Sequence, residues 1–201
     1  MRDGRATCWS WEVSGNVEEV HALLCACDAY TATPEAPAPS RNVETTRRRV
    51  QAGSVNVLRL GSEAVAMFTL TWDAPFTVDP SVYPSAQKPA YIGRLAVKPE
   101  LMKKGSFIGA RCLRKAIELA VSAGADAIRS EANPDLTRVR ALLDLLGFKE
   151  YGQAQSEGGR RRVYLQKTIV RPTVSSGERV SDIGHERAAG IWYEAMMPRP
   201  R

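Results

Sequence analysis

The sequence has few residues that bind metals or form disulfides. Its 201 residues include only two histidines, His21 and His185, and four cysteines, at positions 8, 25, 27 and 112. Neither type occurs at a spacing typical of a metal site, and Cys25 and Cys27 point in different directions on the helix expected there. We therefore expect no metal ion, and cysteines that stay reduced and have a structural role.

The chain also lacks a long apolar run. No segment approaches the length of a transmembrane helix, and the N-terminal residues MRDGRATCWSW contain no apolar region typical of a signal peptide. These absences predict a cytoplasmic protein with no membrane partner. Hydrophobic residues make up 44% of the chain and charged residues 25%, a balance that suits one globular domain with a real core.

Charge of one sign is not concentrated in long blocks. The formal net charge is +6, which favours anionic ligands, but basic and acidic residues are interspersed over most of the chain. Short arginine runs occur at 47–49 and 160–162, and the first is typical of a solvated helix face. The charge therefore permits nucleic-acid binding but does not indicate it.

The stretch from Tyr91 to Gly124 organises the rest of the sequence. Apolar residues from Tyr91 to Val97 predict a buried strand, which ends before Pro99 because proline has no N–H for a strand ladder. A polar, basic turn follows, and apolar residues at every third or fourth position then predict a helix that ends at Gly124. A glycine-bearing loop that opens a helix presents free backbone N–H groups and the positive end of the helix dipole. This junction is therefore the candidate anion-binding site.

Periodic patterns predict the remaining elements. Before the central stretch we expect a strand at Thr7–Val13, a helix capped by Asn16, a helix at Arg41–Ala52, and two strands, Ser54–Leu60 and Glu63–Trp72, joined by a type II′ turn at Gly61-Ser62. After it we expect a strand at Ala125–Glu131, a helix with Asn133 as N-cap and Pro134 as first residue that ends at Gly147, and two strands, Lys149–Gln155 and Arg161–Ile169. The segment Asp73–Pro89 shows neither the helical nor the strand period of apolar residues. We expect it to shape a binding site or to pack its aromatic residues on the sheet.

The junction resembles the acetyl-CoA site of GNAT-type N-acetyltransferases. Leu95-Ala96-Val97-Lys98-Pro99, followed by Lys104-Gly105-Ser106-Phe107-Ile108-Gly109-Ala110, is similar to the strand, phosphate loop and helix of that family. The family loop has Gln or Arg, two residues, Gly, one residue, then Gly or Ala. This chain departs from the pattern at Lys104, which keeps the positive charge, and at Phe107, which stands at the middle glycine.

A second motif lies at the end of the later helix. Leu145-Leu146-Gly147-Phe148 resembles the family's Leu-Gly-Phe helix end. Leu143 stands at the position where many relatives carry the tyrosine that protonates the departing thiolate. The order of elements matches the family over roughly residues 5–169.

The resemblance implies a fold and a domain organisation. The implied fold is the GNAT fold, of the α/β class (α+β type), with a central, mixed, mostly antiparallel twisted sheet of about six or seven strands and about four helices on its faces. Residues 1–169 would form the acetyltransferase domain, and residues 170–201 a C-terminal extension. The extension contains an apolar cluster within 185–197, and we expect it to be partly ordered, or packed on the domain or on a partner subunit in a homodimer.

The resemblance also implies the site. Acetyl-CoA would be the co-substrate, without a metal, and its binding residues would be Leu95, Ala96, Val97, Lys103, Lys104, Gly105, Ser106, Phe107, Ile108, Gly109, Ala110 and Asn133. Tyr91 stands where relatives often carry a carboxylate base, and we expect it to hold a water molecule or the substrate. Tyr83 is a second catalytic candidate. In the family, the region after the first strand helps to close the acceptor site, a role open here to residues 31–40.

Three functions remain open at this stage. The first is transfer of an acetyl group from acetyl-CoA to a primary amine of a small molecule, such as an amino acid, a metabolite or an amine-bearing antibiotic. The second is a CoA-binding sensor or assembly domain without catalysis, which Phe107 and Leu143 would explain. The third is acylation of a protein N-terminus or of aminoacyl-tRNA, with the two arginine runs as the contact surface.

Overall fold

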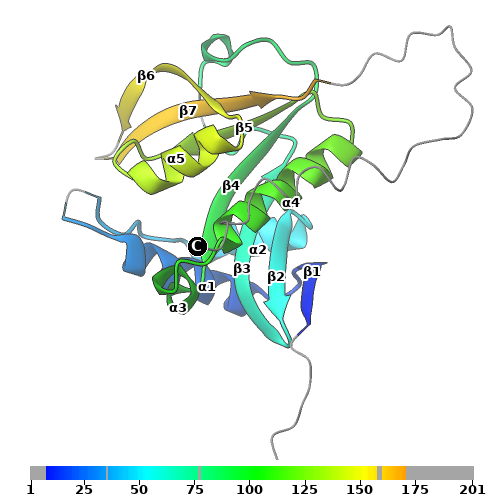
Figure 1. The fold of residues 1–201 in the computed structure, drawn as a ribbon, viewed down its shortest axis with the longest axis vertical. Coiled ribbons are helices and arrows are strands. Elements are labelled where there is room, and N and C mark those ends of the chain that lie inside the picture. The colour runs from blue at the N-terminus through cyan, green and yellow to red at the C-terminus, as the bar shows by residue number, and fades with distance from the viewer. Residues whose placement is uncertain (1–7, 35, 77, 158–159, 171–201) are drawn as a thin grey trace, which may run out of the picture. The chain divides into compact units, whose positions relative to one another are not determined.

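The computed structural model describes residues 8–34, 36–76, 78–157 and 160–170 (Figure 1). Its strands are β1 (Trp9–Val13), β2 (Val55–Leu60), β3 (Glu63–Thr71), β4 (Pro89–Val97), β5 (Ala127–Ala132), β6 (Lys149–Glu157) and β7 (Arg160–Thr168). Its helices are α1 (Val17–Thr31), α2 (Val43–Gln51), α3 (Pro99–Lys103), α4 (Ile108–Ser122) and α5 (Thr137–Leu145), with a 3₁₀ helix η1 at Pro80–Val82. The predicted C-terminal extension begins at residue 170, which is described. The rest of the extension, including 185–197, lies outside the described residues.

The strands form one sheet in the order β1-β2-β3-β4-β5-β7-β6. Every neighbouring pair is antiparallel except β4 and β5, which run parallel. The predicted mixed, mostly antiparallel sheet is therefore confirmed, and so is the α/β class. The chain returns from β4 to β5 through α3 and α4, as a parallel pair requires a crossover connection.

Helices cover both faces of the sheet, and each face has its own apolar core. Ile92 and Val97 of β4 pack with Ile108 and Leu113 of α4 in one core. Ala96, next to Val97, instead packs with Val20 and other apolar residues of α1 in the second core. Because adjacent strand residues point to opposite faces, α4 and α1 lie on opposite sides of β4, as the ribbon shows (Figure 1).

Several local expectations hold. Leu60 pairs with Glu63, and Gly61 has a φ of 63°, so a two-residue turn joins β2 and β3 as predicted. Asn16 caps α1, since its side chain accepts a hydrogen bond from the N–H of Glu19. Gly147 follows α5 with a φ of 84°, in the left-handed conformation expected of a glycine after a helix.

The structure differs from the local expectations at two helices. The basic turn after Val97 contains a short helix, α3, and the described part of the chain has five α-helices, in line with the expected fold. The last helix starts at Thr137 with Leu136 at its N-cap position, not at Pro134. The reason is that the Asn133 side-chain oxygen accepts a hydrogen bond from the N–H of Asp135, at 2.9 Å, and so forms a turn ahead of the helix. None of the described helices combines the length and apolar character needed to cross a bilayer.

Candidate active site

Strands β4 and β5 separate partway along their length. Their pairing covers only Pro89 to Tyr91 of β4, which lie opposite Ala127 to Arg129 of β5. Both strands continue, because β4 reaches Val97 and β5 stays paired with β7 as far as Ala132. The backbone of β4 beyond Tyr91 is therefore not paired with β5 and offers an edge to a ligand.

A bulge in β4 lies beside this separation. The three residues from Met67 to Thr69 of β3 lie opposite the four residues from Gly93 to Ala96 of β4, so β4 has one extra residue there. Arg94 lies within this bulge, and its φ of 50° makes it the one non-glycine with positive φ among the described residues. The bulge shifts the in-and-out alternation of side chains along β4 by one residue, so that Ile92 and Leu95, three residues apart, both pack on the α4 side.

The N-terminus of α4 presents unpaired backbone donors. Phe107 is the N-cap residue and its side chain makes no capping hydrogen bond. Along α4, Arg111 is the first residue whose N–H makes the i to i−4 helical hydrogen bond, since it donates to the carbonyl of Phe107 at 3.0 Å. The N–H groups of Ile108, Gly109 and Ala110 consequently have no acceptor within the helix, and they carry the positive end of its dipole. A helix terminus of this kind suits an anion.

The loop before α4 keeps this end of the helix open. Gly105 has a φ of 66°, and its N–H donates to the carbonyl of Met102. The Phe107 side chain is 85% exposed, so it points to solvent and does not fill the loop. Lys103 lies with its Nζ 5.4 Å from the ring centre of Tyr30, at the end of α1. The predicted residues 103–110 thus lie together in the structure around one helix terminus.

On the other side of the sheet, the two predicted catalytic tyrosines meet a buried arginine. Arg129 of β5 is only 7% exposed, and it donates to the Tyr91 hydroxyl at 3.2 Å and to the Gln166 Oε1 at 2.8 Å. Its guanidinium carbon lies 4.5 Å from the ring centre of Tyr83, and its Nη2 donates to the Pro84 carbonyl. Sequence reasoning missed Arg129. No local signal in the sequence marked it, since Glu131 in the same strand is also charged.

The Tyr83 hydroxyl stays protonated, so it cannot act as a base that accepts a proton from the substrate. Burial raises the pKa of its hydroxyl well above the usual range, and this effect outweighs the opposing charge of Arg129. Its hydroxyl is buried without a hydrogen-bond partner among the described residues. Tyr83 and Phe76 both contact Tyr164 of β7, at ring-centre distances of 6.0 and 5.9 Å. The segment 73–89 therefore packs its aromatic residues on the sheet, the second of the two outcomes expected for it.

The remaining candidate positions do not add an acid or a nucleophile. Leu143 is 3% exposed and belongs to the α4-side core. Cys112 is fully buried, and burial raises the pKa of its thiol to about 12, which keeps it protonated at neutral pH. Asn133 follows the end of β5 and is half-buried. Within the described ranges, no group of three or more His, Cys, Asp or Glu side chains is arranged to hold a metal ion.

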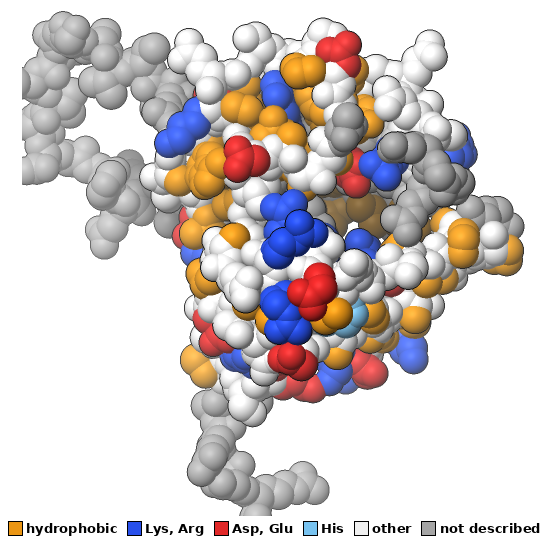
Figure 2. Space-filling view, turned by 180° about the vertical axis from the view of Figure 1, so that it is seen from behind, with side chains coloured by type: hydrophobic (Ala, Val, Ile, Leu, Met, Phe, Trp, Pro, Cys, Tyr) orange, Lys and Arg blue, Asp and Glu red, His pale blue; other side chains and the backbone are white. Residues whose placement is uncertain are grey.

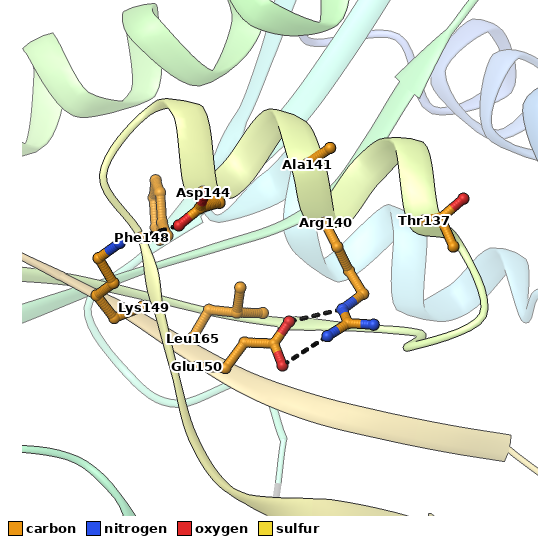
Figure 3. A pocket seen from close by; sticks show the side chains of 8 residues that line it. All are labelled: Thr137, Arg140, Ala141, Asp144, Phe148, Lys149, Glu150 and Leu165. Atoms are coloured by element: carbon orange, nitrogen blue, oxygen red, sulfur yellow. Dashed lines mark hydrogen bonds and ion pairs between the residues drawn. The ribbon is translucent and has the colours of Figure 1, made fainter.

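A separate pocket of about 440 Å³ lies beside α5 (Figure 3). It is lined by Thr137, Arg140, Ala141, Asp144, Phe148, Lys149, Glu150 and Leu165. Arg140 and Glu150 form a two-pronged ion pair within it, at 2.6 and 2.9 Å (Figure 3). None of the predicted site residues lines this pocket, so it is distinct from the junction between β4 and α4.

Comparisons with known proteins identify the fold. No family model and no curated protein matches the sequence. Solved structures do match. A GNAT-family acetyltransferase from Streptococcus agalactiae aligns with a TM-score of 0.63 at 12% identity, over 81% of this chain and 96% of its own. The ribosomal-protein-alanine N-acetyltransferase of Brucella melitensis aligns with a TM-score of 0.58 at 17% identity, over 80% and 99%.

A third structure was solved with its cofactor. The yncA protein of Salmonella typhimurium, in complex with acetyl-CoA, aligns with a TM-score of 0.59 at 14% identity, over 88% of this chain and 99% of its own. At such identities the likeness defines the fold. The chain has the GNAT fold of the N-acetyltransferases, as the sequence motifs implied.

Proposed function

We propose that this protein is an acetyl-CoA-dependent N-acetyltransferase that acts on a primary amine of a small molecule. The observation that carries the proposal is the junction itself, where β4 separates from β5 just before a helix with three free N–H groups. These two features suit the two chemical parts of the cofactor. The helix N-terminus suits its phosphates, and the unpaired edge of β4 suits its amide-bearing arm.

In this proposal each predicted residue has a defined task. The N–H groups of Ile108, Gly109 and Ala110 hold the pyrophosphate, with Lys103 and Lys104 adding positive charge and 105–107 shaping the loop. Backbone groups of Leu95, Ala96 and Val97 hold the pantetheine arm and polarise the thioester carbonyl, which is the reacting group that the cofactor supplies. Asn133, at the end of β5, contacts the same arm. The position of the amine against the carbonyl then provides much of the rate, on the order of 7–11 kcal/mol in favourable cases.

The amine must lose a proton before it attacks. We propose that the Tyr91 hydroxyl, which Arg129 holds in place, binds a water molecule that accepts this proton or binds the amine itself. Tyr83 packs against Arg129 and keeps water away from the buried side of the cluster. Because Leu143 cannot donate a proton, the departing thiolate takes its proton from solvent.

The decisive experiment is calorimetric titration with acetyl-CoA, followed by measurement of free thiol release in the presence of a panel of amines. Saturable one-site binding with amine-dependent thiol release is the expected result. Lack of any acetyl-CoA binding would remove the proposal and leave only the fold likeness.

Substitution at Gly109 tests where the cofactor binds. Gly109→Phe should weaken acetyl-CoA binding by at least about tenfold, because a ring on the first turn of α4 blocks approach to the free N–H groups. Gly109→Ala is the matched control, since an added Cβ meets only Leu142 Cδ2 at an ordinary 3.6 Å. Equal affinity of the Phe variant and the wild type would place the phosphate site elsewhere.

A second candidate function has a specific observation in its favour. Leu143, at the position where many relatives carry a proton-donating tyrosine, has no proton to donate. Among the described residues, no carboxylate forms a hydrogen bond with Tyr91. A domain that binds CoA without transferring an acetyl group, as a sensor or assembly partner, would need neither group. Acetyl-CoA binding without thiol release across a broad amine panel would favour this function. The cytoplasmic location, a homodimer and the domain boundary near residue 169 remain parts of the proposal.

A further inference from the structure

Arg94 occupies an unusual position in the backbone. It lies in the β4 bulge with a φ of 50°, a conformation that a residue with a Cβ adopts at a cost and that glycine adopts freely. Strain of this kind persists where the surrounding structure or a function requires the side chain. The outlier directs attention to what the Arg94 guanidinium contacts.

The Arg94 side chain extends toward α2, on the face opposite α4. Its Nη1 donates to the Thr46 hydroxyl at 3.3 Å, a long hydrogen bond to a neutral group. Thr46 is fully buried on α2, and the His21 ring of α1 lies 3.1 Å from the same hydroxyl. Arg94 itself remains partly exposed, so a ligand can reach its guanidinium.

Positive charge around Arg94 exceeds the negative charge. Arg41 is paired with Asp28 through two hydrogen bonds of 2.6 and 2.9 Å, which neutralises that pair. For Arg49 and Arg94, the described part of the chain provides no ion pair. Partial burial lowers the pKa of Arg94, and repulsion from Arg41 and Arg49 lowers it further. Figure 2 shows this face, where basic side chains lie near the histidine with acidic side chains among them.

We propose that Arg94 binds an anionic group, a carboxylate or a phosphate, on the amine acceptor. This inference rests on the proposed function, since it places the acceptor beside the Leu95–Val97 backbone that holds the thioester. A guanidinium matches either oxyanion with two parallel hydrogen bonds, and a partly buried one does so with little competition from water. The acceptor would therefore be an amino acid or an amine phosphate, whereas polyamines would be repelled.

Matched pairs of acceptors provide the test. Thiol release is measured with β-alanine against β-alaninamide, with glutamate against its diamide, and with phosphoethanolamine against ethanolamine. We expect the anionic member of at least one pair to have a kcat/KM at least about tenfold higher than its neutral partner, mainly through KM. The carboxylate and phosphate pairs together identify which anion the site prefers.

Variants then assign the effect to Arg94. Arg94→Gly removes the guanidinium and suits the observed φ, so the fold is preserved, and Arg94→Lys keeps the charge without the two-pronged geometry. Both should erase the preference for the anionic acceptor, fully in the Gly variant and in part in the Lys variant, while the acetyl-CoA affinity stays within about twofold. Arg48→Gln removes one charge from an exposed position of α2 and should leave the preference intact.

The outcomes separate this inference from the function on which it rests. If the protein binds acetyl-CoA and acetylates neutral amines as well as anionic ones, the inference is wrong and the transferase stands. Loss of acetyl-CoA binding in Arg94→Gly would assign Arg94 to the cofactor and also overturn the inference. If the wild-type protein does not bind acetyl-CoA, the proposed function fails first, and the inference fails with it.

Discussion

Among single residues, Arg129 connects several elements near the candidate site. A buried guanidinium requires hydrogen-bond acceptors for its donors, and here all of the direct acceptors are neutral: the Tyr91 hydroxyl, the Gln166 side chain and the Pro84 carbonyl. Its stacking on Tyr83 adds a cation–π contact. Arg129 thus joins β4, β5, β7 and the segment 73–89 at the place where β4 and β5 part.

This arrangement makes a prediction about stability. Arg129→Met keeps most of the side-chain volume but leaves the acceptors of buried Tyr91 and Gln166, and the partly buried Pro84 carbonyl, without their donor, so the free energy of unfolding should fall by about 2–4 kcal/mol. Chemical denaturation of the variant and of wild type measures the difference. Arg48→Gln, at an exposed site, is the control and should change the free energy of unfolding by less than about 0.5 kcal/mol. A loss for Arg129→Met as small as that of the control would show that the network contributes little.

At the scale of elements, one arginine ties α1 to the strands beneath it. Arg59 of β2 donates to both carboxylate oxygens of Glu19 on α1, at 3.0 and 2.7 Å, and to Glu12 of β1 at 2.7 Å. The pKa of the Glu19 carboxyl is lowered, chiefly by its hydrogen bonds from Arg59, while partial desolvation opposes the shift. Glu19 therefore stabilises the fold most when it is ionised.

The sign of the pH dependence follows from that shift. Because the folded-state pKa of Glu19 lies below its unfolded value near 4.5, its contribution is present above that pH and is lost as the pH falls through the folded-state pKa. Glu19→Gln should cost about 1 kcal/mol at pH 7, a modest value since the pair is partly exposed, and progressively less as the pH falls through the folded-state pKa of Glu19. Urea denaturation of both proteins across this range measures the difference. A gap between them that widens toward acid would contradict the assignment.

The order of elements could be predicted because hydrophobic period and turn residues act locally. The strand ending at Val97, the helix from Ile108 and the glycine after α5 all follow from a few neighbouring residues. The start of α5 could not be predicted, since Asn133 has two possible uses for its side chain, a helix cap or a turn, and the tertiary structure selects the turn. The helix α3 was missed because it is only five residues long, too short for its two apolar residues, Leu101 and Met102, to show a helical period.

The site was predictable only where it depends on the local backbone. The free N–H groups at the start of α4 follow from the loop before it, so this helix terminus could be predicted from the sequence as a candidate site. The β4 bulge depends on the register with β3, and the separation of β4 from β5 depends on where their pairing stops. Arg94 and Arg129 acquire their surroundings from these long-range pairings, and no local pattern distinguishes them from other arginines.

At the scale of the whole molecule, the net charge of +6 raises the question of a nucleic-acid acceptor. Three of the six arginines in the two runs proposed as its contact surface are paired with acids. The ion pairs are Arg47 with Glu44, Arg161 with Asp135 and Arg162 with Glu131. Each such pair must be weakened before its arginine can neutralise a phosphate, so these runs form a poor surface for RNA.

The salt dependence of acetyl transfer decides this question. An acceptor that makes six to ten phosphate contacts would lose about 10³–10⁵-fold in affinity between 50 and 200 mM salt, through counterion release. A small anionic amine makes one contact of this kind, so its KM should rise by less than about tenfold over the same range. The acetyl-CoA affinity, titrated in the same salt series, is the control because the cofactor phosphates are screened whichever acceptor is used. A KM that rises by orders of magnitude more than the acetyl-CoA dissociation constant would point to RNA, since no small acceptor releases that many counterions.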